Sequence, residues 1–249
     1  MGRPANGFDA PGLRGMLGSL LAQMRTQDCY FCGMASPTAL CAPCSAALPR
    51  LPQARCRCCA LPSPAGNLCG RCLSEKPHYD ATVAALAYGY PLDAAIQAFK
   101  YQGRLGLARS FAALLQEALD ADGAAVDLVI ATPLAAPRLA ERGYNQAHAL
   151  ARLLARQRQL KLDAQAVTRN KHAPPQAELP WKERAKNIRG AYTAARRFDG
   201  LSVAVVDDVM TTGSTLNEMA KTLKKAGAVR VTNWVLARTL PAAMAPAKA

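Results

Sequence analysis

The order of apolar and polar positions divides the chain at about residue 80. Beyond that point, short apolar runs alternate with longer segments whose apolar residues recur every three or four positions. This pattern predicts strands over residues 81–90, 126–133, 202–208 and 229–237, and helices over residues 91–101, 107–119, 144–158 and 214–226. Strands alternating with helices favour an α/β fold with a mainly parallel sheet, in which ligands bind beyond the carboxyl ends of the strands.

Two other segments have a weaker helical pattern. A short helix running into a loop is predicted over residues 181–192, after a polar, proline-containing stretch, and the apolar residues between 13 and 24 follow a helical period. The second pattern favours a docked amphipathic helix over a signal peptide. No apolar run reaches the length of about 18 residues that a membrane span needs, so we expect no membrane insertion and a cytoplasmic location.

All nine cysteines lie before residue 80, where periodic apolar sequence is scarce. Eight of them form four C-x-x-C pairs, which are Cys29/Cys32, Cys41/Cys44, Cys56/Cys59 and Cys69/Cys72. One C-x-x-C turn directs two thiolates at a single point, and two such turns complete a tetrahedral zinc site. The sequence therefore predicts two zinc sites, each with four cysteine ligands and paired in chain order, with an interleaved pairing as the alternative. Disulfides fit less well, because no export signal is visible.

Four thiolates leave zinc no open position for water, so both zinc sites are expected to be structural. The segment around them has too little apolar sequence to fold without metal. We therefore predict a zinc-held module over residues 29–79, between an N-terminal helical segment over residues 1–28 and an α/β domain over residues 80–249. Cys58 is the one cysteine outside these pairs and is not expected to be a ligand.

The string "VAVVDDVMTTGSTL" places two carboxylates between an apolar strand and a loop rich in hydroxyl groups. At a strand-to-helix junction, free backbone N–H groups and the helix dipole favour an anion. The carboxylates suit sugar hydroxyls or magnesium-bound waters. Together they indicate a ribose 5-phosphate site, with a capped helix start and exposed acids as the alternative. The residues concerned are Asp207, Asp208, Thr211, Thr212, Gly213, Ser214 and Thr215.

Charge adds a second hypothesis. The formal net charge is +14, and the stretch from Arg138 to Arg197 alone holds 14 basic and 4 acidic residues. Such an excess suits a polyanion, although a solvated basic face that draws in a phosphorylated substrate explains the same residues. Aromatic side chains in this stretch could stack on the bases of single-stranded DNA. The candidates are Arg156 and Arg158 for the phosphates and Tyr144, Trp181 and Tyr192 for the bases.

Several of these motifs occur together in one known family. "VAVVDDVMTTGSTL" resembles the phosphoribosyl pyrophosphate motif of type I phosphoribosyltransferases over its full length. With "ATPLAAPRLAERGYNQAHALAR", "PPQAELPWKERAKNIRGAY" and the cysteine pairs, residues 29–240 resemble the competence-associated ComF family. The resemblance implies a type I phosphoribosyltransferase-like domain with a mainly parallel twisted sheet, preceded by a small double zinc ribbon.

The resemblance also implies a role for individual residues. The two aspartates would serve the ribose hydroxyls and Mg²⁺, residues 211–215 would hold the 5-phosphate, and Asp207, Asp208 and Arg142 form the implied catalytic set. Further contacts to phosphoribosyl pyrophosphate are implied for Thr132, Arg138, Lys100 and Arg189, with Arg104, Asn145, Arg184 and Asn187 nearby in the same motifs.

Two functions are compatible with the sequence. In the first, a phosphoribosyl group moves from phosphoribosyl pyrophosphate to an unidentified acceptor. Purine-salvage relatives carry a carboxylate where this chain has Thr211, which argues against a purine acceptor. In the second, the chain is a non-catalytic module that binds single-stranded DNA or a partner in DNA uptake and keeps the site for ligand sensing. Family association implies a helicase-like competence protein as that partner.

Overall fold

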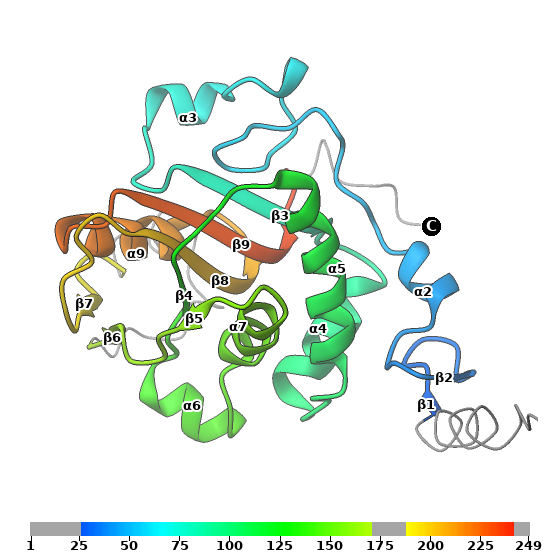
Figure 1. The fold of residues 1–249 in the computed structure, drawn as a ribbon. Coiled ribbons are helices and arrows are strands. Elements are labelled where there is room, and N and C mark those ends of the chain that lie inside the picture. Colours follow the sequence, from blue (N-terminus) through cyan, green and yellow to red (C-terminus); the bar gives the residue numbers. More distant parts are fainter. Residues whose placement is uncertain (1–25, 171–187, 242–249) are drawn as a thin grey trace, which may run out of the picture. The chain divides into compact units, whose positions relative to one another are not determined.

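The computed structural model describes residues 26–170 and 188–241 (Figure 1). The chain divides into two compact units, residues 1–46 and residues 47–249, so the units separate between the two halves of the cysteine-rich segment. The helix predicted over residues 13–24 and most of the helix predicted over residues 181–192 lie outside the described residues.

The larger unit is built on a five-stranded sheet in which every neighbouring pair is parallel, as predicted. The strand order is β3-β9-β8-β4-β5. The strands are β3 (Ala81–Ala87), β4 (Leu128–Ala131), β5 (Lys161–Leu162), β8 (Ser202–Met210) and β9 (Arg230–Arg238). Apart from the two-residue β5, each was predicted within a few residues of its observed bounds.

The connections between these strands place a ligand site between β4 and β8. The chain crosses the sheet in one direction from β3 to β4 and on to β5, and in the opposite direction from β8 to β9. Because parallel crossovers are right-handed, α9 packs on the opposite face of the sheet from α5 and α7. The direction changes between β4 and β8, which is where open α/β sheets bind ligands. The predicted helices are observed as α4 (Leu92–Tyr101), α5 (Leu107–Asp122), α7 (Gln146–Gln157) and α9 (Ser214–Lys225).

The second half of the cysteine-rich segment is part of the core of this unit. Cys56, Cys59, Cys72 and Tyr79 are buried in one apolar cluster with side chains of β8, β9 and α9. The segment is also joined to β3 through its backbone, because Ala87 donates to the carbonyl of residue 49 at 2.9 Å. These cysteines are therefore packed against the sheet as well as against one another.

The segment after β4, for which no element was predicted, contains a helix. In α6 (Ala136–Arg142), Pro137 occupies the first turn, where its missing N–H is not needed, and good helix formers follow it. Gly143 then ends the helix in the left-handed conformation at φ +75°. The helix is too short to show a hydrophobic period, which is why the pattern did not reveal it.

The remaining described elements are short. They are β1 (Gln27–Asp28), β2 (Ala35–Ser36), α2 (Ala42–Ala46), η1 (Pro64–Gly66), α3 (Gly70–Ser74), β6 (Val167–Arg169) and β7 (Tyr192–Ala194). The pairs β1–β2 and β6–β7 are antiparallel. In the part of the chain that the structure describes, no helix combines the length and apolar character needed to cross a membrane.

Candidate functional site

The two predicted carboxylates lie near the carboxyl end of β8. Successive side chains of a strand point to opposite faces, so Asp207 and Asp208 diverge. The Asp208 carboxylate forms an ion pair with Nζ of Lys100 on α4 at 3.1 Å, and both side chains are largely buried. An Asp207 carboxylate oxygen accepts the backbone N–H of Asp208 at 2.9 Å. The structure thus brings Lys100 from a distant part of the chain to the acid pair.

Asp207 is in an unusual electrostatic state. Burial and, to a smaller extent, the Asp208 carboxylate raise the pKa of its carboxyl to about 7, although Lys100 acts in the opposite direction. At neutral pH this group is therefore only partly ionised in the free protein. A divalent cation or the hydroxyls of a sugar would favour its charged form. An aspartate at this position is therefore explained by ligand binding rather than by a contribution to folding stability.

The loop that follows β8 leads into the N-terminus of α9. Gly213 has φ +82°, and a Cβ there would lie 2.6 Å from Cε of Met210 and 3.2 Å from the Tyr79 hydroxyl. The hydroxyls of Thr212 and Ser214 are 2.9 Å apart. The first turn of α9 contains no acidic residue, so its N–H groups present an unopposed positive dipole end. This geometry suits a phosphate group next to the acid pair.

Three more residues that the family resemblance assigns to the substrate lie at the end of β4 and on helix α6. Thr132 is buried, and its backbone N–H donates to the carbonyl of Val206 on β8 at 2.9 Å. Arg138 is half-buried on α6. Arg142 donates from Nη2 to the Tyr101 hydroxyl at 2.8 Å, with its guanidinium 4.6 Å from the centre of that ring. Arg142 therefore ties α6 to α4 beside Lys100.

Two tyrosines of this region were not predicted as substrate contacts. Tyr101 follows Lys100 directly and is half exposed beneath Arg142. Tyr144 packs against Phe99 at 5.8 Å between ring centres, and burial raises the pKa of its hydroxyl. A signal was present in the sequence, since Tyr144 belongs to the quoted motif "ERGYNQ", but its ring was assigned to base stacking instead.

A cavity of about 400 Å³ lies against residues 211–215, which we call the phosphate-type loop. Arg189 is one of its lining residues, and the neighbouring Gly190 N–H donates to the buried carboxylate of Glu218 on α9 at 2.8 Å. The structure therefore places Arg189 next to the loop. Of the other motif residues, Arg184 and Asn187 lie outside the described part of the chain. The cavity walls come from the loop and α9 on one side and from the second cysteine cluster on the other, with Arg71, Cys72, Glu75, Tyr79, Thr212 and Ser214 among them.

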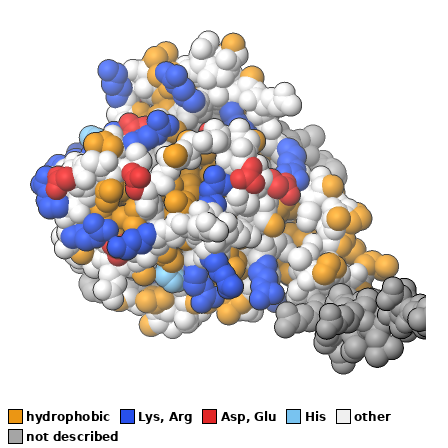
Figure 2. Space-filling model, viewed as in Figure 1, with side chains coloured by type: hydrophobic (Ala, Val, Ile, Leu, Met, Phe, Trp, Pro, Cys, Tyr) orange, Lys and Arg blue, Asp and Glu red, His pale blue; other side chains and the backbone are white. Residues whose placement is uncertain are grey.

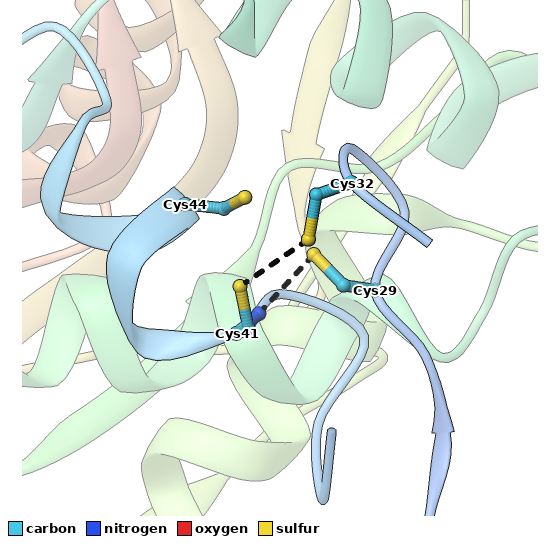
Figure 3. Close-up of side chains that lie close together, drawn as sticks. All are labelled: Cys29, Cys32, Cys41 and Cys44. Atoms are coloured by element: carbon cyan, nitrogen blue, oxygen red, sulfur yellow. Dashed lines mark hydrogen bonds between the residues drawn. The ribbon is translucent and has the colours of Figure 1, made fainter. Parts of the chain in front are cut away.

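The eight paired cysteines form two separate clusters, in the predicted chain order. Cys29, Cys32, Cys41 and Cys44 converge in the smaller unit (Figure 3), and Cys56, Cys59, Cys69 and Cys72 converge in the larger one. Within each cluster the sulfur atoms lie within 4.8 Å of one another. Sulfur atoms around a tetrahedral zinc ion are separated by about 3.8 Å, given Zn–S bonds of about 2.3 Å.

Individual separations agree with that geometry. The sulfur atoms of Cys32 and Cys41 are 3.7 Å apart, and those of Cys59 and Cys69 are 3.5 Å apart. Both clusters could therefore hold zinc without rearrangement of the chain. Cys58 belongs to neither cluster, because its buried thiol faces the carbonyl of Tyr79 at 3.7 Å.

Protein purified without chelators is expected to contain two zinc ions per chain. The Cys58→Ser variant should also contain two, because this thiol faces the carbonyl of Tyr79 and is not one of the four converging cysteines. Metal analysis by mass spectrometry measures both numbers. A single zinc ion in the parent protein, or a loss of one ion in Cys58→Ser, would contradict the assignment of ligands.

The residues predicted for nucleic acid differ in their exposure. Arg156 is exposed on α7. Arg158, the other candidate for the phosphates, pairs with Asp120 at 2.7 Å and packs over the ring of Trp234. Among the aromatic candidates, Tyr192 is buried and Trp181 lies outside the described residues. The exposed charge on this helix is that of Arg156 and of Arg152, one turn before it.

Comparison with known proteins adds to this geometry. Residues 116–247 match the family "Phosphoribosyl transferase domain". The chain is 35% identical over 223 residues to the DNA utilization protein YhgH of Shigella flexneri, covering 85% of this chain and 97% of that protein. It is 39% identical over 178 residues to Competence protein F of Haemophilus influenzae, covering 68% and 78%. A solved adenine phosphoribosyltransferase from Thermoanaerobacter pseudethanolicus covers 53% of this chain and 70% of its own at 18% identity, with a TM-score of 0.34.

Proposed function

Since this chain belongs to the ComF family and contains a phosphoribosyl transferase domain, we propose that it binds phosphoribosyl pyrophosphate together with Mg²⁺. The observation that carries the proposal is that two acids near the end of β8 are followed directly by a phosphate-type loop. Both lie where the direction of the strand connections reverses, between β4 and β8. A 5-phosphate would bind at the start of α9, and the ribose hydroxyls would face Asp207 and Asp208.

The charges around the acids suit a transfer reaction at the ribose. In that reaction the bond from ribose C1 to the pyrophosphate oxygen breaks, and a bond from C1 to the acceptor forms. Mg²⁺ would neutralise the departing pyrophosphate when it is bound. Lys100, Arg138 and Arg142 belong to elements that meet beside β8, and their positive charges would stabilise the same leaving group. The acceptor is the open part of this proposal.

Calorimetric titration tests the proposal. We expect about one phosphoribosyl pyrophosphate to bind per chain in the presence of Mg²⁺, and to bind more weakly in a magnesium-free buffer without chelator, which leaves zinc in place. Ribose 5-phosphate is the matched control ligand, because it offers the phosphate and the ribose without the pyrophosphate. The absence of heat and of thermal stabilisation with phosphoribosyl pyrophosphate and Mg²⁺ would refute the proposal.

A second candidate function is the binding of single-stranded DNA. The printed names of the relatives, DNA utilization protein and Competence protein F, support it, as does the pair of exposed arginines on α7. On the face seen in Figure 2, however, Lys and Arg side chains form several separate groups rather than one continuous basic surface. For that reason we place single-stranded DNA binding, and with it a helicase-like partner, second to the ribose phosphate site. A cytoplasmic location is a separate part of the proposal.

Labelled single-stranded oligonucleotide is expected to bind measurably at low salt, without sequence preference. Each neutralised phosphate adds about −0.7 to the log–log salt slope, so the Arg152→Ala/Arg156→Ala variant should lower its magnitude by about 1.4 if each arginine contacts one phosphate. Fluorescence anisotropy over a salt series measures the slope, with the exposed Arg230 changed to alanine as control. Absent binding, or competition by saturating phosphoribosyl pyrophosphate, would assign the positive charge to the substrate site.

A further inference from the structure

One arginine in the core joins the second cysteine cluster to the phosphate-type loop. Arg238, the last residue of β9, is 1% exposed, and in the described part of the chain it forms no ion pair with a carboxylate. Its guanidinium donates to the carbonyl of Cys59 at 2.8 Å and to that of Met210 at 2.9 Å, and it also contacts the carbonyl of Thr211. A single side chain therefore holds a cluster residue and the first residues of the loop.

Two further contacts cross the same boundary. Arg71, which lies between two cysteines of the cluster, donates from Nη2 to the carbonyl of Thr212 at 2.8 Å. His78 donates its backbone N–H to the side-chain oxygen of Asn217 on α9 at 2.6 Å. Together with Arg238, these bonds hold three consecutive loop carbonyls, those of residues 210–212, from the side of the cysteine cluster. These contacts do not use the N–H groups of the loop, and that of Ser214 donates to the Thr212 hydroxyl at 3.2 Å.

The charge of a filled zinc site explains why an arginine suits position 238, whereas Arg71 is exposed and already pairs with Glu75 at 3.5 Å. Four thiolates and one Zn²⁺ carry a net charge of −2, whereas a buried guanidinium needs a nearby negative charge to offset its lost hydration. With zinc bound, the cluster supplies that charge and fixes the Cys59 carbonyl. Without zinc, no metal–ligand bond fixes the turn that carries the Cys59 carbonyl, which is the acceptor for Arg238.

We propose that zinc at Cys56, Cys59, Cys69 and Cys72 and a phosphate ligand at residues 211–215 are energetically coupled, with Arg238 and Arg71 as the positioning residues that carry the coupling. Zinc holds the two arginines, and the arginines hold the loop in the conformation that presents its N–H groups. The coupling acts in both directions by thermodynamic necessity, so the ligand must also retain zinc. This inference rests on the proposed function for its ligand but not for its loop contacts.

The reciprocal effect is measured as zinc release to a colorimetric chelator, with and without saturating phosphoribosyl pyrophosphate and Mg²⁺. We expect the ligand to slow the release of one of the two zinc ions at least fivefold and to leave the other unchanged. In Arg71→Gln this protection should fall by half or more, while the protein still holds two zinc ions and keeps its melting temperature. The matched control is Arg57→Gln, which removes the same charge from an exposed position of the same module. Equal protection in Arg71→Gln and Arg57→Gln would overturn the coupling.

Hydrogen exchange separates a failure of this inference from a failure of the proposed function. If the parent protein does not bind phosphoribosyl pyrophosphate, exchange of peptides covering residues 210–216 is compared between zinc-loaded Arg71→Gln and Arg57→Gln. Faster exchange in Arg71→Gln alone supports the coupling even then. Equal exchange overturns it. Arg238→Lys, which keeps the charge but lacks the fork that reaches both carbonyls, should behave like Arg71→Gln wherever it folds with two zinc ions.

Discussion

The Asp207→Asn variant is expected to be more stable than the parent protein at pH 8. The carboxyl of Asp207 has its pKa raised to about 7 by burial and by the neighbouring Asp208 carboxylate. An unfolded chain would ionise this group near pH 4. Between these two values the folded state binds the extra proton, so the contribution of Asp207 to stability falls as the pH rises from about 4 to about 7 and is constant above that.

An amide in this position carries no charge at any of these pH values, so the variant does not lose this contribution to stability as the pH rises. The expected gain at pH 8 is on the order of 2–4 kcal/mol and should vanish near pH 4. Urea unfolding at pH 5, 6, 7 and 8 measures it. The control is Asp199→Asn, because Arg197 lowers the pKa of that exposed carboxyl and no such gain is expected there.

Binding should change in the opposite direction. In a variant with both Asp207→Asn and Asp208→Asn, the affinity for phosphoribosyl pyrophosphate with Mg²⁺ is expected to fall at least tenfold, because lost hydrogen bonds to charged groups cost about 1.5–3 kcal/mol each. An Asp207→Asn variant that is more stable and also binds less tightly would mean that Asp207 serves the ligand and not the fold. Unchanged affinity in the folded double variant would show that the motif has lost its ligand.

The sequence predicts most of the sheet because its strands are short apolar runs and its long helices have a clear hydrophobic period. Helix α6 was not predicted because its seven residues, with a proline in the first turn, show no such period. Cysteine pairing was predictable as well, since two C-x-x-C turns close in sequence can meet without knowledge of the fold. Lys100 was placed beside the acids only through the family resemblance, as it is far from Asp208 in the chain.

Contacts between distant segments could not be predicted. Cys59 and Arg238 are 179 residues apart, and an arginine at the end of a predicted strand normally indicates a solvent-exposed terminus. Arg158 shows the same limit, because its exposure depends on Asp120 and on Trp234 from another strand. The sequence places Arg158 at the end of a helix, where exposure is expected, whereas the contacts with Asp120 and Trp234 decide its position.

The two zinc sites are expected to differ in what they stabilise, although their ligands are alike. Cys56 is fully buried among the core side chains of the larger unit, whereas Cys32 is an exposed residue of the smaller unit. Cys56→Ser and Cys32→Ser each remove one thiolate from one cluster, so each variant should lose one zinc ion of the two. The structure therefore offers a matched pair of substitutions with the same chemistry and different surroundings.

Only the Cys56→Ser variant should lower the melting temperature of the larger unit. Structural zinc supplies folding free energy directly, and here the loss also loosens a cluster packed against β8, β9 and α9. A loss of about 3 kcal/mol corresponds to a decrease of about 6–12 °C for a unit of this size. Scanning calorimetry of both variants, with zinc counted in each, makes the comparison. Equal decreases in the two variants, or no decrease in Cys56→Ser despite the loss of its zinc, would mean that the second cluster does not support the sheet it is packed against.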